Sequence, residues 1–210
     1  MHQVEFYADS QGNEPVKDFL VELQAKRDSD KSARILSEKI LTYIRVLQEY
    51  GTRAGMPYMR HLDGDIWELR PQPERVLFFS HHNGKFILLH HFRKKTQKTP
   101  KEKLTVPSDV PRTTTKGMIN MGTNFNDLWN DSSFISEEQR NKIDFEVALI
   151  GKLIEARESK GLSQKQLADM CGLKQSAIAR LEKMNVTPQL NTLIKVLKPL
   201  GYRLDIVPCD

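Results

Sequence analysis

The first part of the chain alternates between the hydrophobic periods of strands and helices. Residues 3–8 alternate apolar and polar positions, which is the period of a strand. Residues 14–26 and 32–50 carry apolar side chains three and four positions apart, which predicts two amphipathic helices. The period of two then returns in four runs, at residues 59–62, 66–70, 75–82 and 85–93. This order predicts an α+β domain over residues 1–98, with two helices packed on a mostly antiparallel sheet.

The second part of the chain is predicted to be helical. Residues 99–117 hold three prolines and five threonines, a composition typical of a linker. Residues 118–143 mix aromatic side chains with acidic ones. From residue 144 the period of 3.6 dominates up to Gly201, and residues 202–207 alternate as a strand would. We therefore expect an all-α domain over residues 144–210.

The charges are spread unevenly. The net charge is +5, with 20 basic against 15 acidic residues over 1–117, 2 against 6 over 118–148, and 10 against 6 over 149–210. Two basic regions favour polyanionic partners, and an acidic region between them is suited to bind one of them. We interpret residues 118–143 as an acidic segment that docks on the first domain, with three aromatic anchors, Phe125, Trp129 and Phe134.

The composition excludes several classes of protein. Hydrophobic residues make up 39% and charged residues 28%, as in a globular protein with folded cores. There is no run of about 18 apolar residues and no secretory signal at residues 1–5, so we expect no membrane span and a cytoplasmic protein. Cys171 and Cys209 have no neighbouring metal-ligand partners, so we expect no disulfide, no metal and no cofactor.

A helix-turn-helix pattern lies within residues 162–182. Ala168 is small where two helices cross, Gly172 permits the positive φ of a turn, and Ile178 clamps the second helix on the first. The outward face of the second helix carries polar and basic side chains, as helices that read base edges do. The candidate DNA-binding residues are Gln164, Lys174, Gln175, Ser176, Arg180 and Lys183. A merely solvated polar face is the alternative.

A second basic group lies in the predicted strands. We expect Arg70, Arg75 and the run from His91 to Lys98 to converge on one face of the sheet. Metal-free cleavage of RNA needs proton transfer at the 2′-hydroxyl and the leaving oxygen, and cations at the phosphate. The candidates are His91, Lys94 and Lys95 for proton transfer, Arg70 and Arg75 for the phosphate, and Arg93, Gln97 and Lys98 for RNA binding. The pattern does not identify the general base, and packing roles for the histidines are the alternative.

Residues 146–207, with the helix-turn-helix pattern above, resemble the Xre/Cro family of helix-turn-helix regulators. The likeness is strongest to its antitoxin branch, in which a short acidic, aromatic-bearing segment precedes the DNA-binding domain. The resemblance implies operator DNA as a partner. It also implies a homodimer that reads paired half-sites.

Three stretches carry a second resemblance: Trp67-Glu68-Leu69-Arg70, Arg75-Val76-Leu77-Phe78-Phe79 and Phe92-Arg93-Lys94-Lys95-Thr96-Gln97-Lys98-Thr99-Pro100. With them, residues 1–100 resemble the HigB branch of the RelE-like toxin superfamily. The resemblance implies a toxin that cleaves mRNA on the ribosome, and an antitoxin of the HigA type that blocks it and represses the shared operon. It places Arg70 and Arg75 on the active surface, and Lys94 and Lys95 at its basic end.

The favoured hypothesis is a toxin–antitoxin pair in one chain, with the neutralising contact made within or between chains. Natural fusion and engineered fusion both fit the sequence. One alternative is a transcription factor whose basic N-terminal domain senses an anionic ligand. A second is a nucleic-acid-binding protein with no catalysis.

Overall fold

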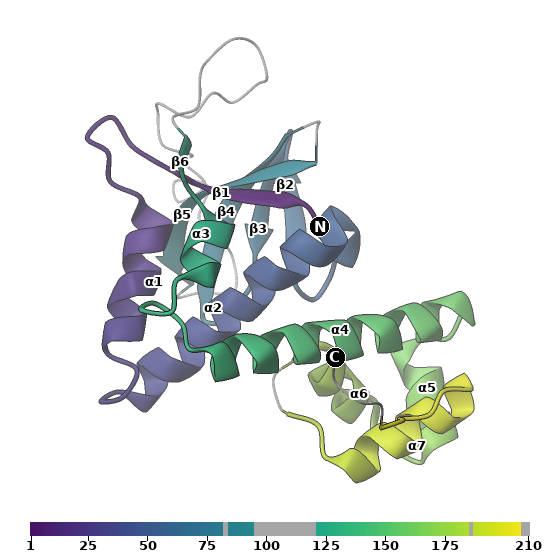
Figure 1. Cartoon of the computed structure of the whole chain (residues 1–210). Helices are drawn as coiled ribbons and strands as arrows, with labels where there is room; N and C mark the ends of the chain where they lie inside the picture. Colours follow the sequence, from purple (N-terminus) through teal and green to yellow (C-terminus); the bar gives the residue numbers. More distant parts are fainter. Residues whose placement is uncertain (82–83, 95–120, 185–186, 207–210) are drawn as a thin grey trace. The chain divides into compact units, whose positions relative to one another are not determined.

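A computed structural model gives the fold of the chain, and it describes residues 1–81, 84–94, 121–184 and 187–206 (Figure 1). The chain divides into two compact units, Met1–Asp144 and Phe145–Asp210. The predicted linker, residues 99–117, lies outside the described residues. Among the helices that are described, none is long and apolar enough to cross a membrane.

The first unit is built on a six-stranded sheet. Along the chain its elements are β1 (Gln3–Tyr7), α1 (Pro15–Ala25), α2 (Lys31–Tyr50), the 3-10 helix η1 (Gly51–Ala54), β2 (Met59–Asp63), β3 (Ile66–Leu69), β4 (Glu74–His81), β5 (Lys85–Arg93), β6 (Met121–Asn124) and α3 (Phe125–Asn130). The order across the sheet is β2-β3-β4-β5-β1-β6. Only the β1–β5 pair among these strands is parallel. The predicted α+β class is therefore confirmed.

Local sequence explains where the two long helices begin and end. Pro15 occupies the first turn of α1, where its missing N–H costs nothing. Asp30 caps α2 by accepting a hydrogen bond from the Ser32 N–H at 2.7 Å. Gly51 ends α2 with a φ of 60° and faces the His2 ring so closely that a Cβ would collide with it. The positive φ is what favours glycine there.

The two faces of the sheet are different. Phe6, Phe78 and Leu88 share the face that α1, α2 and α3 cover (Figure 1). On this face the Phe6 ring lies 6.2 Å from the ring of Phe125 in α3. The other face carries a separate buried cluster, made of Tyr7, Ile66, Leu77, Phe79, Ile87 and Leu89.

A bulge shifts the register between β4 and β5. Leu77 pairs with His90, but Phe78 pairs with Leu88, so Leu89 is an extra residue in β5. Beyond the bulge, Arg75 lies opposite Phe92. Because side chains alternate along a strand, this one-residue shift decides which β5 side chains share a face with Arg75.

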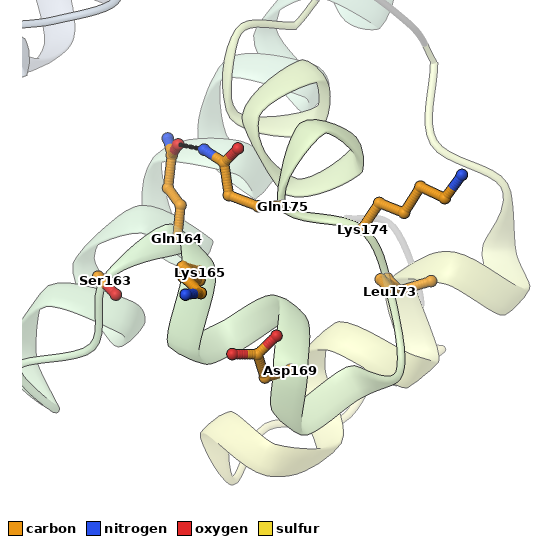
Figure 2. A pocket seen from close by; sticks show the side chains of 7 residues that line it. All are labelled: Ser163, Gln164, Lys165, Asp169, Leu173, Lys174 and Gln175. Carbon is orange, nitrogen blue, oxygen red and sulfur yellow. Dashed lines mark hydrogen bonds between the residues drawn. The ribbon is translucent and has the colours of Figure 1, made fainter.

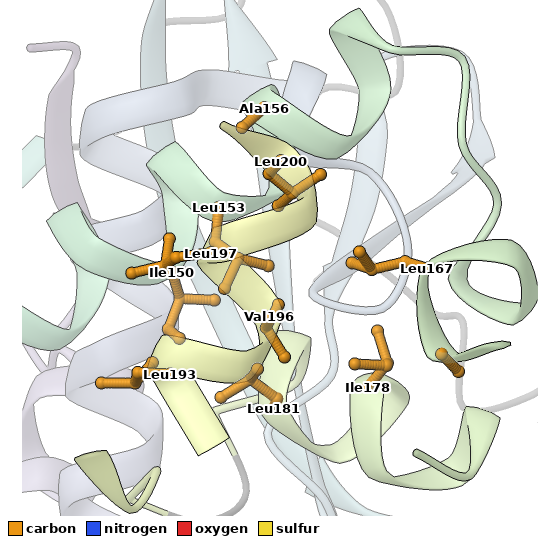
Figure 3. Packing of buried hydrophobic residues seen from close by; sticks show 11 residues of the cluster. Ile150, Leu153, Ala156, Leu167, Ile178, Leu181, Leu193, Val196, Leu197 and Leu200 are labelled. Atoms are coloured by element: carbon orange, nitrogen blue, oxygen red, sulfur yellow. The ribbon is translucent and has the colours of Figure 1, made fainter. Parts of the chain in front are cut away.

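The second unit is all helical. It contains most of α4 (Glu137–Ser159), within which the boundary between the units falls, then α5 (Gln164–Cys171), α6 (Gln175–Glu182) and α7 (Leu190–Leu200). Figure 3 shows the core that these helices share, formed by Ile150, Leu153, Ala156, Leu167, Ala168, Ile178, Leu181, Leu193, Val196, Leu197 and Leu200. The predicted all-α domain is confirmed. The strand predicted for residues 202–207 is wrong as far as it is described, because residues 202–206 are neither strand nor helix.

Candidate nucleic-acid interfaces

The helix-turn-helix in the second unit is defined by its caps. Ser163 and Gln166 form a reciprocal capping box that starts α5. Gly172 ends α5 in the left-handed region, with a φ of 65°, and its N–H bonds back to the Ala168 carbonyl. Ala168 and Ile178 are both fully buried where α5 and α6 cross. The spacing of small residue, glycine and aliphatic residue therefore has the structural roles that the sequence predicted.

The side chains predicted to bind DNA lie on the open side of this motif. Lys174, Gln175, Ser176 and Arg180 are exposed, and Gln164 and Lys183 are partly exposed. An open pocket of about 620 Å³ lies between the start of α5 and the start of α6 (Figure 2). It is lined by Ser163, Gln164, Lys165, Asp169, Leu173, Lys174 and Gln175. The arrangement leaves basic and amide groups available to an incoming polyanion, while their roles in binding stay predictions.

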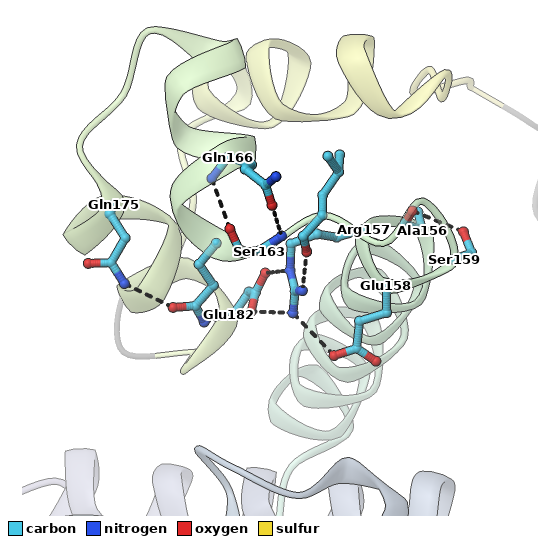
Figure 4. Close-up of polar contacts among 10 residues, drawn as sticks. Ala156, Arg157, Glu158, Ser159, Ser163, Gln166, Gln175 and Glu182 are labelled. Carbon is cyan, nitrogen blue, oxygen red and sulfur yellow. Dashed lines mark hydrogen bonds and ion pairs between the residues drawn. The ribbon is translucent and has the colours of Figure 1, made fainter.

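A chain of polar contacts joins this face to the interior (Figure 4). Arg157 of α4 and Glu182 of α6 form a buried ion pair, with Nε to Oε1 at 2.6 Å. Gln164 donates to Glu182 Oε2 at 2.9 Å, and Gln175 donates to Gln164 Oε1 at 3.1 Å. Burial disfavours the Arg157 charge, but Glu182 outweighs it and the pKa of Arg157 is raised. The buried Arg157–Glu182 ion pair thus orients the two glutamines.

In the first unit, Arg70 and Arg75 lie together beside one carboxylate. Glu68 Oε1 is 3.4 Å from Arg70 Nε and 3.6 Å from Arg75 Nε. Arg75 is 3% exposed and Glu68 1%, whereas the Arg70 side chain is 17% exposed. Burial lowers the pKa of the Arg75 guanidinium, although Glu68 opposes this. The structure brings the two arginines together as expected, and Arg70 is the more accessible.

His91 does not share their face of the sheet. Phe92 lies opposite Arg75, so its neighbour His91 projects to the face that carries α1, where its ring stacks on Phe19 at 3.8 Å. The expected convergence of His91 with Arg70 and Arg75 is therefore wrong. The physical reason is the bulge at Leu89, because an unshifted register would have placed His91 opposite Arg75.

The other predicted members of the basic group are only partly described. Arg93 is exposed and lies opposite Glu74 in the β4–β5 register. The Lys94 N–H donates to the Pro73 carbonyl at 3.2 Å, so this residue sits beside the turn that joins β3 and β4. Three candidates lie outside the described residues: Lys95, Gln97 and Lys98. Their roles stay predictions.

His91 is expected to make stability depend on pH. Burial, with a smaller contribution from His90, lowers its pKa to about 4, and Glu74 at 3.8 Å is too far away to hydrogen-bond it. The unfolded chain therefore takes up the proton first, and about 3 kcal/mol of stability is lost as pH falls from about 6.5 towards 4. His91→Phe, which keeps the stacking on Phe19, should remove this component from urea unfolding measured between pH 4 and 7. An exposed histidine serves as the control, with His61→Phe; equal pH dependence in both variants would contradict the prediction.

Sequence reasoning missed a set of contacts between α1, α2 and the segment 121–144. The Glu14 carboxylate accepts the N–H and the hydroxyl of Thr123, and Lys17 donates to Thr123 Oγ1 at 2.6 Å. Gln48 of α2 donates to Asn126 Oδ1 at 2.9 Å. No signal in the sequence marks this, because Met121-Gly122-Thr123-Asn124 lacks apolar alternation.

Two further aromatic and ionic contacts fix the same segment. Arg45 Nε donates to Asp144 at 2.7 Å, and its guanidinium lies 5.0 Å over the Trp129 ring. Phe125 and Trp129 are buried, as is Phe134.

The described residues contain no cluster of three or more His, Cys, Asp or Glu that is arranged to hold a metal.

These features define a two-part protein, and comparison with known proteins assigns each part. Residues 18–107 match the family described as phage derived protein Gp49-like, and residues 153–207 match a helix-turn-helix family. The chain joins a Gp49-like domain to a DNA-binding helix-turn-helix domain. It belongs to the family of helix-turn-helix transcriptional regulators, because it is 46% identical over 88 residues to an uncharacterized HTH-type transcriptional regulator of Haemophilus influenzae, a match that covers 42% of this chain and 88% of that protein.

Two more relatives are similar over part of this chain. The HTH-type transcriptional regulator PuuR of Escherichia coli is 43% identical over 53 residues, which is 25% of this chain and 29% of PuuR. A solved structure described as a toxin–antitoxin module from Streptococcus pneumoniae is 43% identical, and the match covers 42% of this chain and 96% of that one, with a TM-score of 0.37.

Proposed function

We propose that this chain is a toxin–antitoxin pair fused in one polypeptide. The first unit is the toxin, an endoribonuclease that cleaves mRNA on the ribosome. The second unit is the antitoxin domain, which binds operator DNA, as a homodimer, and represses its own operon. The HigB and HigA resemblances of the sequence and the Gp49-like match over residues 18–107 support the proposal.

The observation that carries the proposal is the position of the segment 121–144. This segment lies outside both family matches, which end at residue 107 and begin at residue 153. Its first half nevertheless supplies β6 to the edge of β1 and α3 to the helical face of the first unit. Phe125 is completely buried there, as the aromatic anchor of a docked segment is.

The contact favours steric neutralisation. β6 adds to one edge of the sheet, whereas Arg70 and Arg75 flank the β3–β4 turn, and β5 and β1 separate β4 from β6. The described part of the segment therefore packs away from the two arginines. We propose that it keeps the toxin from entering the ribosomal decoding site by adding bulk, with no need to cover Arg70.

We propose a separate role for each part of the basic group. Arg70, the more accessible arginine, is proposed to bind the scissile phosphate and stabilise its developing charge, since guanidinium donates in a fixed fork. Arg75 and Glu68 are buried beside it, and the Glu68 carboxylate lies within ion-pair distance of both guanidinium groups. Lys94 and Lys95 are proposed to supply proton transfer, and Arg93, Gln97 and Lys98 to bind the RNA strand. His91, on the opposite face, has no proposed part in the chemistry.

Separate expression of the two forms tests the proposal. Residues 1–117, which lack β6 and α3, should arrest growth of a bacterial host and cause cleavage of ribosome-bound mRNA, whereas the full chain should do neither. Arg70→Ala in residues 1–117 should restore growth at an equal level of soluble protein. Normal growth and intact mRNA with soluble residues 1–117 would refute the nuclease.

A second candidate function is favoured by the burial of Arg75. Because Arg75 is 3% exposed and lies beside Glu68, a non-catalytic first unit that binds RNA or an anionic ligand also fits. In that case, ribosomes incubated with residues 1–117 would show mRNA protection without new cleavage ends.

A further inference from the structure

Glu14 and Lys17 hold one residue of the strand that pairs with the edge of β1. Glu14 is the residue before α1, yet its carboxylate does not cap that helix. It turns to β6, where Oε1 accepts the Thr123 N–H and Oε2 accepts the Thr123 hydroxyl. Lys17 donates to both partners, at 2.5 Å to Glu14 and 2.6 Å to Thr123. A threonine at this position therefore satisfies polar atoms that an apolar side chain would leave unpaired.

The residue before Thr123 lies directly against the Glu14 carboxylate. A Cβ built on Gly122 would overlap Glu14 Oε1 and press on the two carbons behind it. The Glu14 side chain would have to swing away, which breaks its bonds to Thr123, or the strand would have to lift from β1. In either case a larger residue weakens the polar contacts between Glu14 and Thr123.

The residues after Thr123 pack against the helical face of the sheet. Asn124 caps α3 by accepting the Asn126 N–H at 2.8 Å, which turns the chain over the sheet. Phe125 is then completely buried, with its ring 6.2 Å from Phe6 and 5.5 Å from Trp129. The polar end of the turn is held by Gln48, which donates to Asn126.

We propose that the edge of β1, together with Glu14, Lys17 and the apolar surface around Phe6 that covers Phe125, is a peptide-binding site selective for the sequence Gly-Thr-Asn-Phe. Its ligand is an extended segment of this sequence, held by main-chain pairing for affinity and by Glu14 for specificity. In the single chain the ligand is Met121–Trp129 itself, and the same sequence supplied separately binds the vacated site. The inference extends the proposed function by naming the toxin–antitoxin contact, but it does not depend on RNA cleavage.

A peptide-binding experiment tests the selectivity. The full chain carrying both Gly122→Val and Phe125→Ala should release its own segment and bind a fluorescent peptide of residues 121–136, followed by anisotropy. A peptide with Gly122→Ala should bind at least tenfold more weakly, and a peptide with Met121→Ala, a matched change at an exposed side chain, should bind as well as the original. Equal binding of the original peptide and the Gly122→Ala peptide would overturn the proposal.

A double-variant cycle on the intact chain gives a second test that needs no vacant site. Gly122→Ala should lower the folding equilibrium constant at least tenfold more in the presence of Glu14 than in a Glu14→Ala background, because the obstructing carboxylate is then absent. Additive effects would overturn the role of Glu14. The outcomes stay separate from those of the growth assay: coupling without growth arrest retains the peptide site and removes the nuclease, and growth arrest without coupling does the reverse.

Discussion

Replacing Arg157 by methionine is expected to destabilise the second unit by about 3–5 kcal/mol. Arg157 and Glu182 are both buried, and their ion pair joins α4 to α6. Methionine fills similar volume but leaves the Glu182 carboxylate without its cation in a low-dielectric interior, where an unpaired charge is costly. Hydrogen exchange of the amides in α6 measures the effect directly, because it reports the local opening free energy of this unit.

The matched control is an arginine in an exposed pair. Arg203 lies 3.3 Å from Asp205, but its side chain is 87% exposed, so Arg203→Met should leave exchange in α6 nearly unchanged. If Arg157→Met altered the exchange protection of α6 no more than this control, the Arg157–Glu182 pair would not be what orients Gln164 and Gln175.

The second large effect is expected on DNA affinity. The double variant Gln175→Ala with Arg180→Ala removes two exposed side chains from α6, each of which is worth about 1–3 kcal/mol if it reads a base edge. The combined loss is then roughly 30-fold to 10⁴-fold in affinity for DNA taken from upstream of the gene, measured by anisotropy at fixed salt.

A variant with the same loss of positive charge provides the comparison. Lys195 is exposed on α7, outside the helix-turn-helix, and Lys195→Ala should weaken binding by only a few-fold through the general field. The unfolding of the double variant should match that of the parent, since both side chains are exposed. Unchanged DNA affinity in the double variant would remove α6 as the recognition helix.

The parts of the structure that could be predicted are those set by residues close together in the sequence. The helix-turn-helix follows from residues within one short stretch, because Ser163, Ala168 and Gly172 each act on neighbours a few positions away. The strands β2 to β5 alternate visibly, and the residues that start α1 and α2 lie beside those helices. Patterns of this kind need no knowledge of distant contacts.

The parts that could not be predicted depend on tertiary contacts. Met121–Asn124 has no strand pattern and becomes β6 because the edge of β1 and the Glu14 carboxylate are available to pair with it. The position of His91 depends on a single extra residue, Leu89, which forms a bulge. No glycine or other turn residue at this point of the sequence indicates that bulge. Alternation predicted correctly that neighbouring β5 side chains point to opposite faces, but the register decided which of them meet Arg75.

Because β6 pairs with β1 of the same chain, this contact depends little on the concentration of the protein. When a strand and its acceptor belong to two separate proteins, the fraction bound depends on the concentration of each. Here strand and acceptor are synthesised together in equal number, and the connecting chain sets their effective concentration. Occupancy of the β1 edge is therefore the same at low and at high expression, so dilution by cell growth does not vacate it.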